Sequence, residues 1–145
     1  MKKLKSHLLL LLTVGCLIAV IASCKKSSNN SAITKENLAG SYMLTSLTIT
    51  IPPLPAQNII DSVPACKRDD IIKLNADLSM EFIDAGTKCV PAGDDTSTWA
   101  LSGSIITVDT TVSTIKTFDG KTLVVTTDVT FNGFAGTTTE TLTKQ

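Results

Sequence analysis

Cys24 is the residue whose type and position point most directly to chemistry. It ends an apolar run at 8–22, which follows three lysines near the N-terminus, and polar residues begin directly after it. A cysteine thiolate is a nucleophile that can accept an alkyl group. The run is shorter than the roughly 20 apolar residues that a membrane-spanning helix needs. We therefore expect a cleaved signal peptide at 1–23 rather than a permanent transmembrane helix.

The four residues that end this segment, Ile21-Ala22-Ser23-Cys24, resemble the lipobox of bacterial lipoproteins. In a lipobox, an aliphatic residue and two small residues precede the cysteine. The resemblance implies a diacylglycerol attached to Cys24 by a thioether, cleavage before Cys24, and an acyl chain such as palmitate on the new N-terminus. Two or more chains anchor a protein firmly where one anchors it marginally, so the expected partner is a membrane. The alternative interpretation is an ordinary buried cysteine.

The other cysteines follow from the same expectation. Cys16 would leave with the signal peptide, so Cys66 and Cys89 would be the two remaining thiols. An exported chain meets an oxidising compartment, and we expect these two cysteines to form a disulfide. The competing interpretation, a metal site, needs more ligands than two isolated cysteines provide.

Few side chains are suited to acid–base catalysis. His7 is the only histidine and would leave with the signal peptide, which removes the side chain most used for proton transfer near neutral pH. The only adjacent carboxylates are Asp69-Asp70 and Asp94-Asp95. Neighbours in a strand point to opposite faces, so we expect these pairs to be solvated loop ends. The sequence therefore predicts no enzyme, no metal site and no cofactor.

The charge balance excludes a further class of function. The chain has 13 basic and 13 acidic residues, and loss of residues 1–23 would remove Lys2, Lys3 and Lys5 but no acidic residue. The mature chain would then be mildly acidic, which argues against a nucleic-acid partner.

The elements that must position these residues are β-strands. From residue 41 onward the pattern has a period of two, which predicts half-buried antiparallel strands. In 123–131, for example, Val125, Val129 and Phe131 alternate with Thr126, Asp128 and Thr130. Asp119-Gly120 and Asn132-Gly133 predict two-residue hairpin turns. Consecutive hairpins favour an all-β, up-and-down barrel over a two-sheet sandwich. We expect eight strands, at 41–51, 70–75, 78–84, 97–102, 104–110, 112–118, 122–131 and 136–143.

Two segments lie outside this pattern. Lipidated Cys24 and a polar tether would occupy 24–33, before a domain at 34–145 that opens with a helical turn capped by Thr34. The segment 52–69 contains four of the five prolines and cannot be a central strand. It could form a lid through Leu54, Ile59 and Ile60, or a proline-stiffened surface connection, and both interpretations stay open.

The domain resembles the lipocalin-like domains found in lipoproteins of the Bacteroidota. The resemblance rests on 38–42, 66–70, 74–77, Cys89 and 99–106, where a glycine precedes an aromatic, a cysteine precedes paired acids, and a tryptophan strand turns through glycine. It departs from that pattern at Tyr42, where tryptophan is usual, and at Ala76-Asp77-Leu78, where Asp-Gly is common. The resemblance implies an eight-stranded lipocalin-like barrel and says little about a ligand.

A barrel cavity would be lined by aromatic side chains if it held a small hydrophobic molecule. The candidate ligand-binding residues are Tyr42, Phe82, Trp99 and Phe118, and the alternative is that they only pack the core. Phe134 is the aromatic most expected to be exposed.

Two short patterns concern modification and location. Asp61-Ser62-Val63 and Asp109-Thr110-Thr111 resemble acceptors for O-glycosylation in the Bacteroidota, with Ser62 favoured because it lies in a loop. The residues after Cys24 are basic and polar rather than the acidic run associated with surface export in this phylum. We therefore expect an outer-membrane lipoprotein on the periplasmic face that binds a small hydrophobic ligand or a partner protein. The alternative is a structural envelope lipoprotein with a solid barrel.

Overall fold

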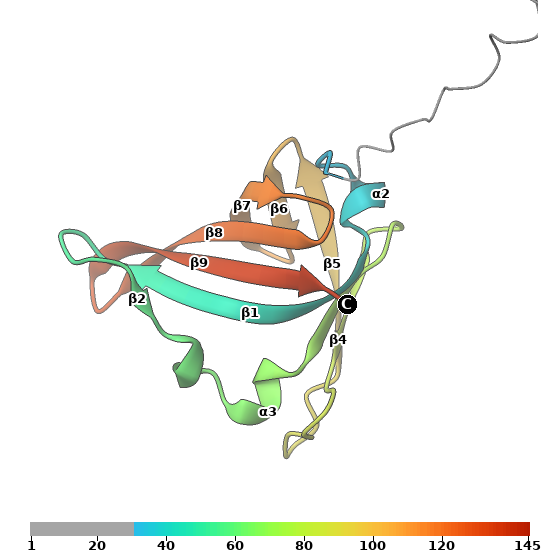
Figure 1. Cartoon of the computed structure of the whole chain (residues 1–145), viewed down its shortest axis with the longest axis horizontal. Helices are drawn as coiled ribbons and strands as arrows, with labels where there is room; N and C mark the ends of the chain where they lie inside the picture. Colours follow the sequence, from blue (N-terminus) through green and yellow to red (C-terminus); the bar gives the residue numbers. More distant parts are fainter. Residues whose placement is uncertain (1–30) are drawn as a thin grey trace, which may run out of the picture.

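The sheet closes on itself to form an antiparallel barrel (Figure 1). This computed structural model describes residues 31–145, and Cys24 with the expected signal peptide lies outside them. The elements in chain order are α2 (Lys35–Leu38), β1 (Gly40–Thr50), β2 (Gln57–Asn58), η1 (Ile60–Ser62), α3 (Ala65–Arg68), β3 (Ile71–Leu74), β4 (Ser79–Ile83), β5 (Asp95–Ser102), β6 (Ile105–Val108), β7 (Thr111–Phe118), β8 (Thr122–Phe131) and β9 (Phe134–Lys144).

The strand order confirms the predicted up-and-down barrel. β3 to β9 pair in sequence, and β1 pairs with both β3 and β9, which closes the barrel with eight strands. The short β2, which the sequence did not predict, pairs only with β1, at Thr48 and Ile49. The predicted helical turn is also present, and the Asn37 amide donates to Thr34 Oγ1 at 3.3 Å.

The two strongest turn signals had different outcomes. Asn132-Gly133 forms the predicted two-residue turn, with both residues at positive φ between the paired Phe131 and Phe134. The two-residue turn predicted at Asp119-Gly120 is wrong, because Phe118 pairs with Leu123 and four residues lie between them. The Asp119 carboxylate accepts from the amide of Lys121 at 2.8 Å and from that of Thr122 at 2.5 Å. This local side-chain bonding supports the longer turn.

One end of the barrel, here called the closed end, is covered by α2 and filled with large side chains. Tyr42 and Leu38 are fully buried, and Tyr42 Oη donates to the Leu38 carbonyl at 2.7 Å. Trp99 is 2% exposed, and its indole N–H donates to the Asn75 carbonyl at 3.0 Å. The rest of the core cluster is Leu74, Met80, Ile106, Ile115, Phe118, Leu123, Val125 and Leu142.

The other end, here called the open end, carries the long connections. Because β3 is short, it pairs only with the first four residues of β1, and the second half of β1 takes β2 as its neighbour instead. The segment from β2 through η1 to α3 then runs below β1 toward β4 (Figure 1). The 84–94 connection between β4 and β5 lies at the same end.

Candidate functional site

A pocket of about 340 Å³ lies at the open end of the barrel. Leu44 of β1, Ile72 of β3 and Phe82 of β4 form its apolar part. Each lies two residues from a core side chain on the same strand, so all three point into the barrel. The remaining lining residues come from the loops: Lys67, Asp70, Gly93 and Asp95.

A disulfide holds two of the loops that supply this lining. Cys66 of α3 is bonded to Cys89, with a Cα–Cα distance of 5.2 Å, so the predicted disulfide is confirmed. Lys67 follows Cys66 directly, and Gly93 lies in the loop that contains Cys89. The disulfide therefore ties the two sides of the pocket entrance together.

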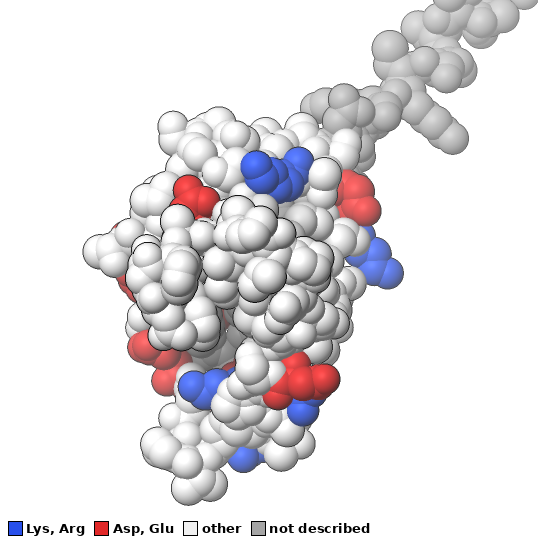
Figure 2. Space-filling model, turned by 90° about the vertical axis from the view of Figure 1, so that its left-hand side faces the viewer, with Lys and Arg blue, Asp and Glu red and all other residues white. Residues whose placement is uncertain are grey.

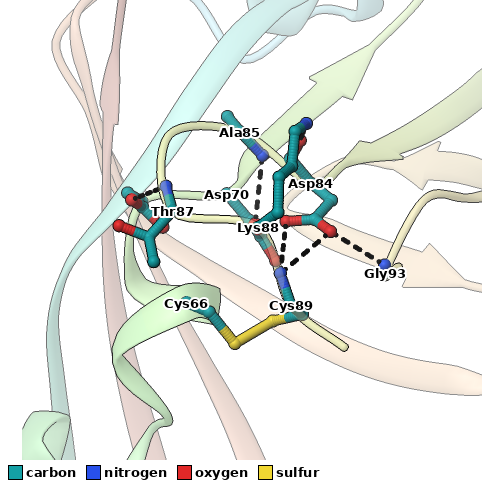
Figure 3. Close-up of a disulfide and its surroundings, with 9 residues drawn as sticks. Cys66, Asp70, Asp84, Ala85, Thr87, Lys88, Cys89 and Gly93 are labelled. Carbon is teal, nitrogen blue, oxygen red and sulfur yellow. Dashed lines mark hydrogen bonds between the residues drawn. A yellow bond between two sulfur atoms is a disulfide. The ribbon is translucent and has the colours of Figure 1, made fainter. Parts of the chain in front are cut away.

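A buried carboxylate holds the second of these loops in shape. Asp84 is fully buried, and its carboxylate accepts from the amide of Cys89 at 3.1 and 3.2 Å and from that of Gly93 at 3.1 Å (Figure 3). Its own amide donates to Asp94 Oδ1 at 2.9 Å. Buried charges persist when they are hydrogen-bonded in this way, so Asp84 organises the 84–94 connection.

The Asp69-Asp70 pair binds the same connection from the other side. Asp69 Oδ2 accepts from the Thr87 amide at 2.8 Å. Asp70 Oδ1 accepts from the Ala85 amide at 3.3 Å (Figure 3). Both side chains are partly buried, and Asp69 Oδ1 is buried without a hydrogen-bond partner. The expectation of solvated loop ends is therefore wrong for this pair and holds only for Asp94 and Asp95, which are exposed.

Each carboxylate of the Asp69-Asp70 pair thus accepts a hydrogen bond from a backbone amide. Within residues 31–145, no group of three or more His, Cys, Asp or Glu side chains could hold a metal ion. No sequence pattern indicates these loop contacts, because the partners lie 15 and 18 residues away along the chain.

The barrel wall formed by β7, β8 and β9 is more polar than the wall that lines the pocket. Ser113 and Thr127 point inward and their hydroxyls lie 2.7 Å apart. Glu140 on β9 pairs with Val125 of β8 and Leu47 of β1. Directly opposite residues of an antiparallel pair share a face, and Val125 is in the core. Glu140 therefore points into the barrel, and its burial raises its pKa above the ordinary value of 4.5.

The four aromatic candidates separate into two groups. Tyr42, Trp99 and Phe118 are buried in the closed-end core, and burial raises the pKa of Tyr42 to about 12. Phe82 alone of the four lines the pocket. The expectation that Phe134 is exposed is confirmed, at 65%.

Sequence reasoning missed Leu44, Ile72, Lys67 and Glu140. The period of two in 138–142 could have placed Glu140 on the same inner face as Leu142. No sequence pattern indicated that Glu140 lies near the pocket.

The possible modification sites lie on the surface. Ser62 is exposed at the end of η1, and its hydroxyl donates to the Ile59 carbonyl at 2.6 Å. Thr110 lies in the exposed turn between β6 and β7. Of the three residues considered for a lid, Leu54 is 56% exposed, and Ile59 donates its amide to the Leu47 carbonyl alongside β1.

The charged surface is mixed in sign. Figure 2 shows acidic and basic side chains around a largely uncharged centre on one face, with a recess in the lower half. Among residues 31–145, no helix is long and apolar enough to cross a membrane.

The fold and the pocket define a class of protein: a small closed β-barrel that is solid at one end and hollow at the other. Comparison with known protein families identifies the family of this barrel. The family model of the lipocalin-like domain matches residues 38–125, and the chain belongs to this family. No curated protein and no solved structure matches it significantly.

Proposed function

We propose that this chain is a lipid-anchored envelope lipoprotein whose barrel binds a small hydrophobic molecule at its open end. The observation that carries the binding proposal is the pocket of about 340 Å³ between Leu44, Ile72 and Phe82. Ligand sites are typically concavities of roughly this size, mostly apolar with a few polar groups. The lipocalin-like fold is compatible with ligand binding but does not define the ligand.

Two measurements test the binding proposal. Native mass spectrometry of the mature protein, purified from its own envelope, is expected to show a co-purifying small molecule. In addition, the neutral fluorophore N-phenyl-1-naphthylamine is expected to bind the delipidated domain and to bind several-fold more weakly after Phe82→Ala. The matched control is Phe131→Ala, which removes a 54% exposed phenyl ring outside the pocket lining.

The outcomes separate the candidate functions. A bare mass together with no fluorophore binding would reject a ligand-binding barrel and leave a structural lipoprotein. Equal loss of affinity in the two variants would show that the fluorophore binds elsewhere on the surface.

The anchor is proposed from the Ile21-Ala22-Ser23-Cys24 motif and from the polar residues that follow it. The resemblance to lipoproteins of the Bacteroidota supports an outer-membrane location, and the basic residues after Cys24 favour the periplasmic face. Cys24→Ala is expected to move the protein from the membrane to the soluble fraction. Ser23→Ala is the control, because it changes a neighbouring residue, keeps a small side chain before the cysteine and keeps the thiol. Membrane attachment that persists in Cys24→Ala would reject the lipid anchor.

The membrane face is tested by adding protease to intact cells. A protein on the periplasmic face is expected to resist digestion until the outer membrane is permeabilised. Digestion in intact cells would place it on the outside. Mass analysis of the same material would show whether Ser62 carries a glycan.

A further inference from the structure

The interior of the open end carries an acidic group that no protein contact uses. Glu140 is partly buried on β9, and within residues 31–145 its carboxylate makes no hydrogen bond or ion pair. Partial burial of a carboxylate without a partner is unfavourable, and the Glu140 oxygens keep some contact with solvent, because Asp69 Oδ1 is the one fully buried side-chain oxygen without a partner within residues 31–145. The neighbouring inward positions of β9 carry uncharged residues, Thr138 and Leu142, so the barrel does not require a charged residue at position 140 for packing. The Glu140 carboxylate therefore faces the barrel interior without a protein partner and is accessible to a bound molecule.

Glu140 is not one of the residues that line the pocket, but the strand register places it near the lining residue Leu44. Glu140 pairs with Leu47, and Leu142 pairs with Leu44, which lines the pocket. On one face of an antiparallel pair, Glu140 and Leu44 are diagonal neighbours, within reach of long side chains or of a molecule between them. The β-bulge between Leu44 and Ser46 shifts the register at this point and keeps both residues on the inner face.

The charges that face the pocket are predominantly negative. Its lining contains two carboxylates, Asp70 and Asp95, and one ammonium group, that of Lys67. β9 itself carries Lys144 on its inner face. This side chain is directed to the closed end, where its ammonium group donates to the Asn37 carbonyl at 2.9 Å. It lies 5.6 Å from the Tyr42 ring centroid. Lys144 is therefore engaged away from Glu140.

We infer that the pocket selects hydrophobic molecules with a cationic amine head, held by Glu140 while the apolar part packs on Leu44, Ile72 and Phe82. This inference rests on the proposed ligand-binding function and names the chemical class of the ligand. An ammonium group supplies the hydrogen-bond donor and the opposite charge that the Glu140 carboxylate lacks. The acidic side chains at the entrance favour approach of a cation over an anion.

The test compares three probes that have the same eight-carbon chain: octylamine, octanol and octanoate. Affinity is measured by displacement of N-phenyl-1-naphthylamine from the domain. Octylamine is expected to bind about tenfold or more tightly than octanol, because hydrogen bonds to charged groups are worth more than neutral ones. Octanoate is expected to bind most weakly. Glu140→Gln should remove the preference for octylamine and leave the affinity for octanol unchanged.

Glu36→Gln is the matched control, since it removes the same charge at an exposed position of α2. It is expected to keep the full preference for octylamine. A loss of preference in this control that equals the loss in Glu140→Gln would overturn the inference, because net charge alone would then account for it.

A second measurement needs no variant. The carboxyl carbon resonance of Glu140, followed by NMR across pH, should report a pKa that falls when octylamine is added and does not change with octanol. An unchanged pKa in saturating octylamine would overturn the inference.

The outcomes distinguish this inference from the proposed function beneath it. If the three probes bind with similar affinity, the barrel is a hydrophobic binding protein and the amine selectivity is wrong. If none of them binds and the fluorophore does not bind either, the proposed function fails, and the inference fails with it.

Discussion

The two ends of the barrel are built from the same strands but solve different physical problems. At the closed end, Tyr42 and Trp99 are almost fully buried and each donates its polar hydrogen to a backbone carbonyl. At the open end, the inner side chains of the same strands are only partly buried, and the loops are held by a disulfide and by carboxylates. The difference shows that the closed end supplies most of the packing stability, while the open end is shaped so that a space remains.

The largest expected effect separates packing from binding. Trp99→Ala should lower the free energy of unfolding by about 3–5 kcal/mol, as for other buried aromatic truncations. Phe82→Ala should cost less, about 1–2 kcal/mol, because the ring is only partly buried and borders a pocket. Urea denaturation measures both. Octanol affinity should fall in Phe82→Ala and stay unchanged in Trp99→Ala, provided that the latter is still folded.

Equal costs for the two substitutions would contradict the division of the barrel into a packed end and a hollow end. The circular dichroism spectrum of Trp99→Ala at low temperature is the control for folding. If that variant is unfolded, Trp99→Phe provides the same comparison with a smaller loss of volume.

The second largest effect concerns the disulfide at the open end. Replacing both Cys66 and Cys89 with alanine should lower stability by roughly 3.5 kcal/mol, since the bond closes a loop with a sequence separation of 23. The pocket should also lose affinity for octanol, because Lys67 and Gly93 on its two sides are no longer tied together. Urea denaturation and fluorophore displacement measure the two effects.

A stability loss with unchanged affinity would show that the carboxylate contacts alone hold the pocket entrance. Asp84→Asn is the companion variant, because it keeps the disulfide and weakens the acceptor that binds the Cys89 and Gly93 amides. It is expected to cost about 1–3 kcal/mol, the range for a disturbed buried hydrogen bond.

A pH titration compares the ionisable groups of the two ends. Burial raises the folded-state pKa of Glu140 above its ordinary value of 4.5. The folded state therefore holds this proton more tightly, so the stabilising contribution is present below 4.5 and is lost as pH rises through the raised pKa. Wild type should thus lose stability relative to Glu140→Gln over this interval. Thermal melting of both proteins between pH 4 and 8 measures the difference.

The pKa values of three other carboxylates are shifted in the opposite direction, so stability must be compared between wild type and Glu140→Gln. Hydrogen bonds lower the pKa of Asp77, Glu81 and Asp119, so their contributions are lost as pH falls, and both proteins share them. At the closed end, burial raises the pKa of Tyr42 to about 12, so the stability that this shift contributes is lost only as pH rises from 10 to about 12. A constant difference between the two melting curves from pH 4 to 8 would contradict the burial of Glu140.

The same comparison explains which features the sequence could predict. Alternation of apolar residues identifies strands and their inner faces, because it depends on neighbours two positions apart. Their aromatic type predicted that Tyr42, Phe82 and Trp99 would line a cavity or pack the core, but it could not tell which end of the barrel each would reach. That depends on strand register, such as the pairing of Tyr42 with Ile72 and of Leu44 with Leu142.

The open-end loops were less predictable for a related reason. The disulfide followed from the number of cysteines left in an exported chain, a property that does not need the fold. The contacts of Asp69, Asp70 and Asp84 are made to amides that become neighbours only after the β4–β5 connection folds back toward α3. Composition and periodicity carry no information about such pairs.

The smallest expected effect tests the closed end at one backbone position. Leu78 has φ of 72°, a conformation that costs a side chain with a Cβ about 1–2 kcal/mol. Leu78→Gly removes this strain and gains flexibility in the unfolded chain, and it loses the buried part of a side chain that is 37% exposed. Relative to Leu78→Ala, which loses nearly the same side chain, it should be more stable by about 0.5–1 kcal/mol. Leu78→Ala, which keeps the Cβ, is the control and should not stabilise. Because the Trp99 amide donates to the Leu78 carbonyl at 2.9 Å, at the closed end, octanol affinity should not change. A gain in stability accompanied by altered affinity would show that the two ends are coupled through β5.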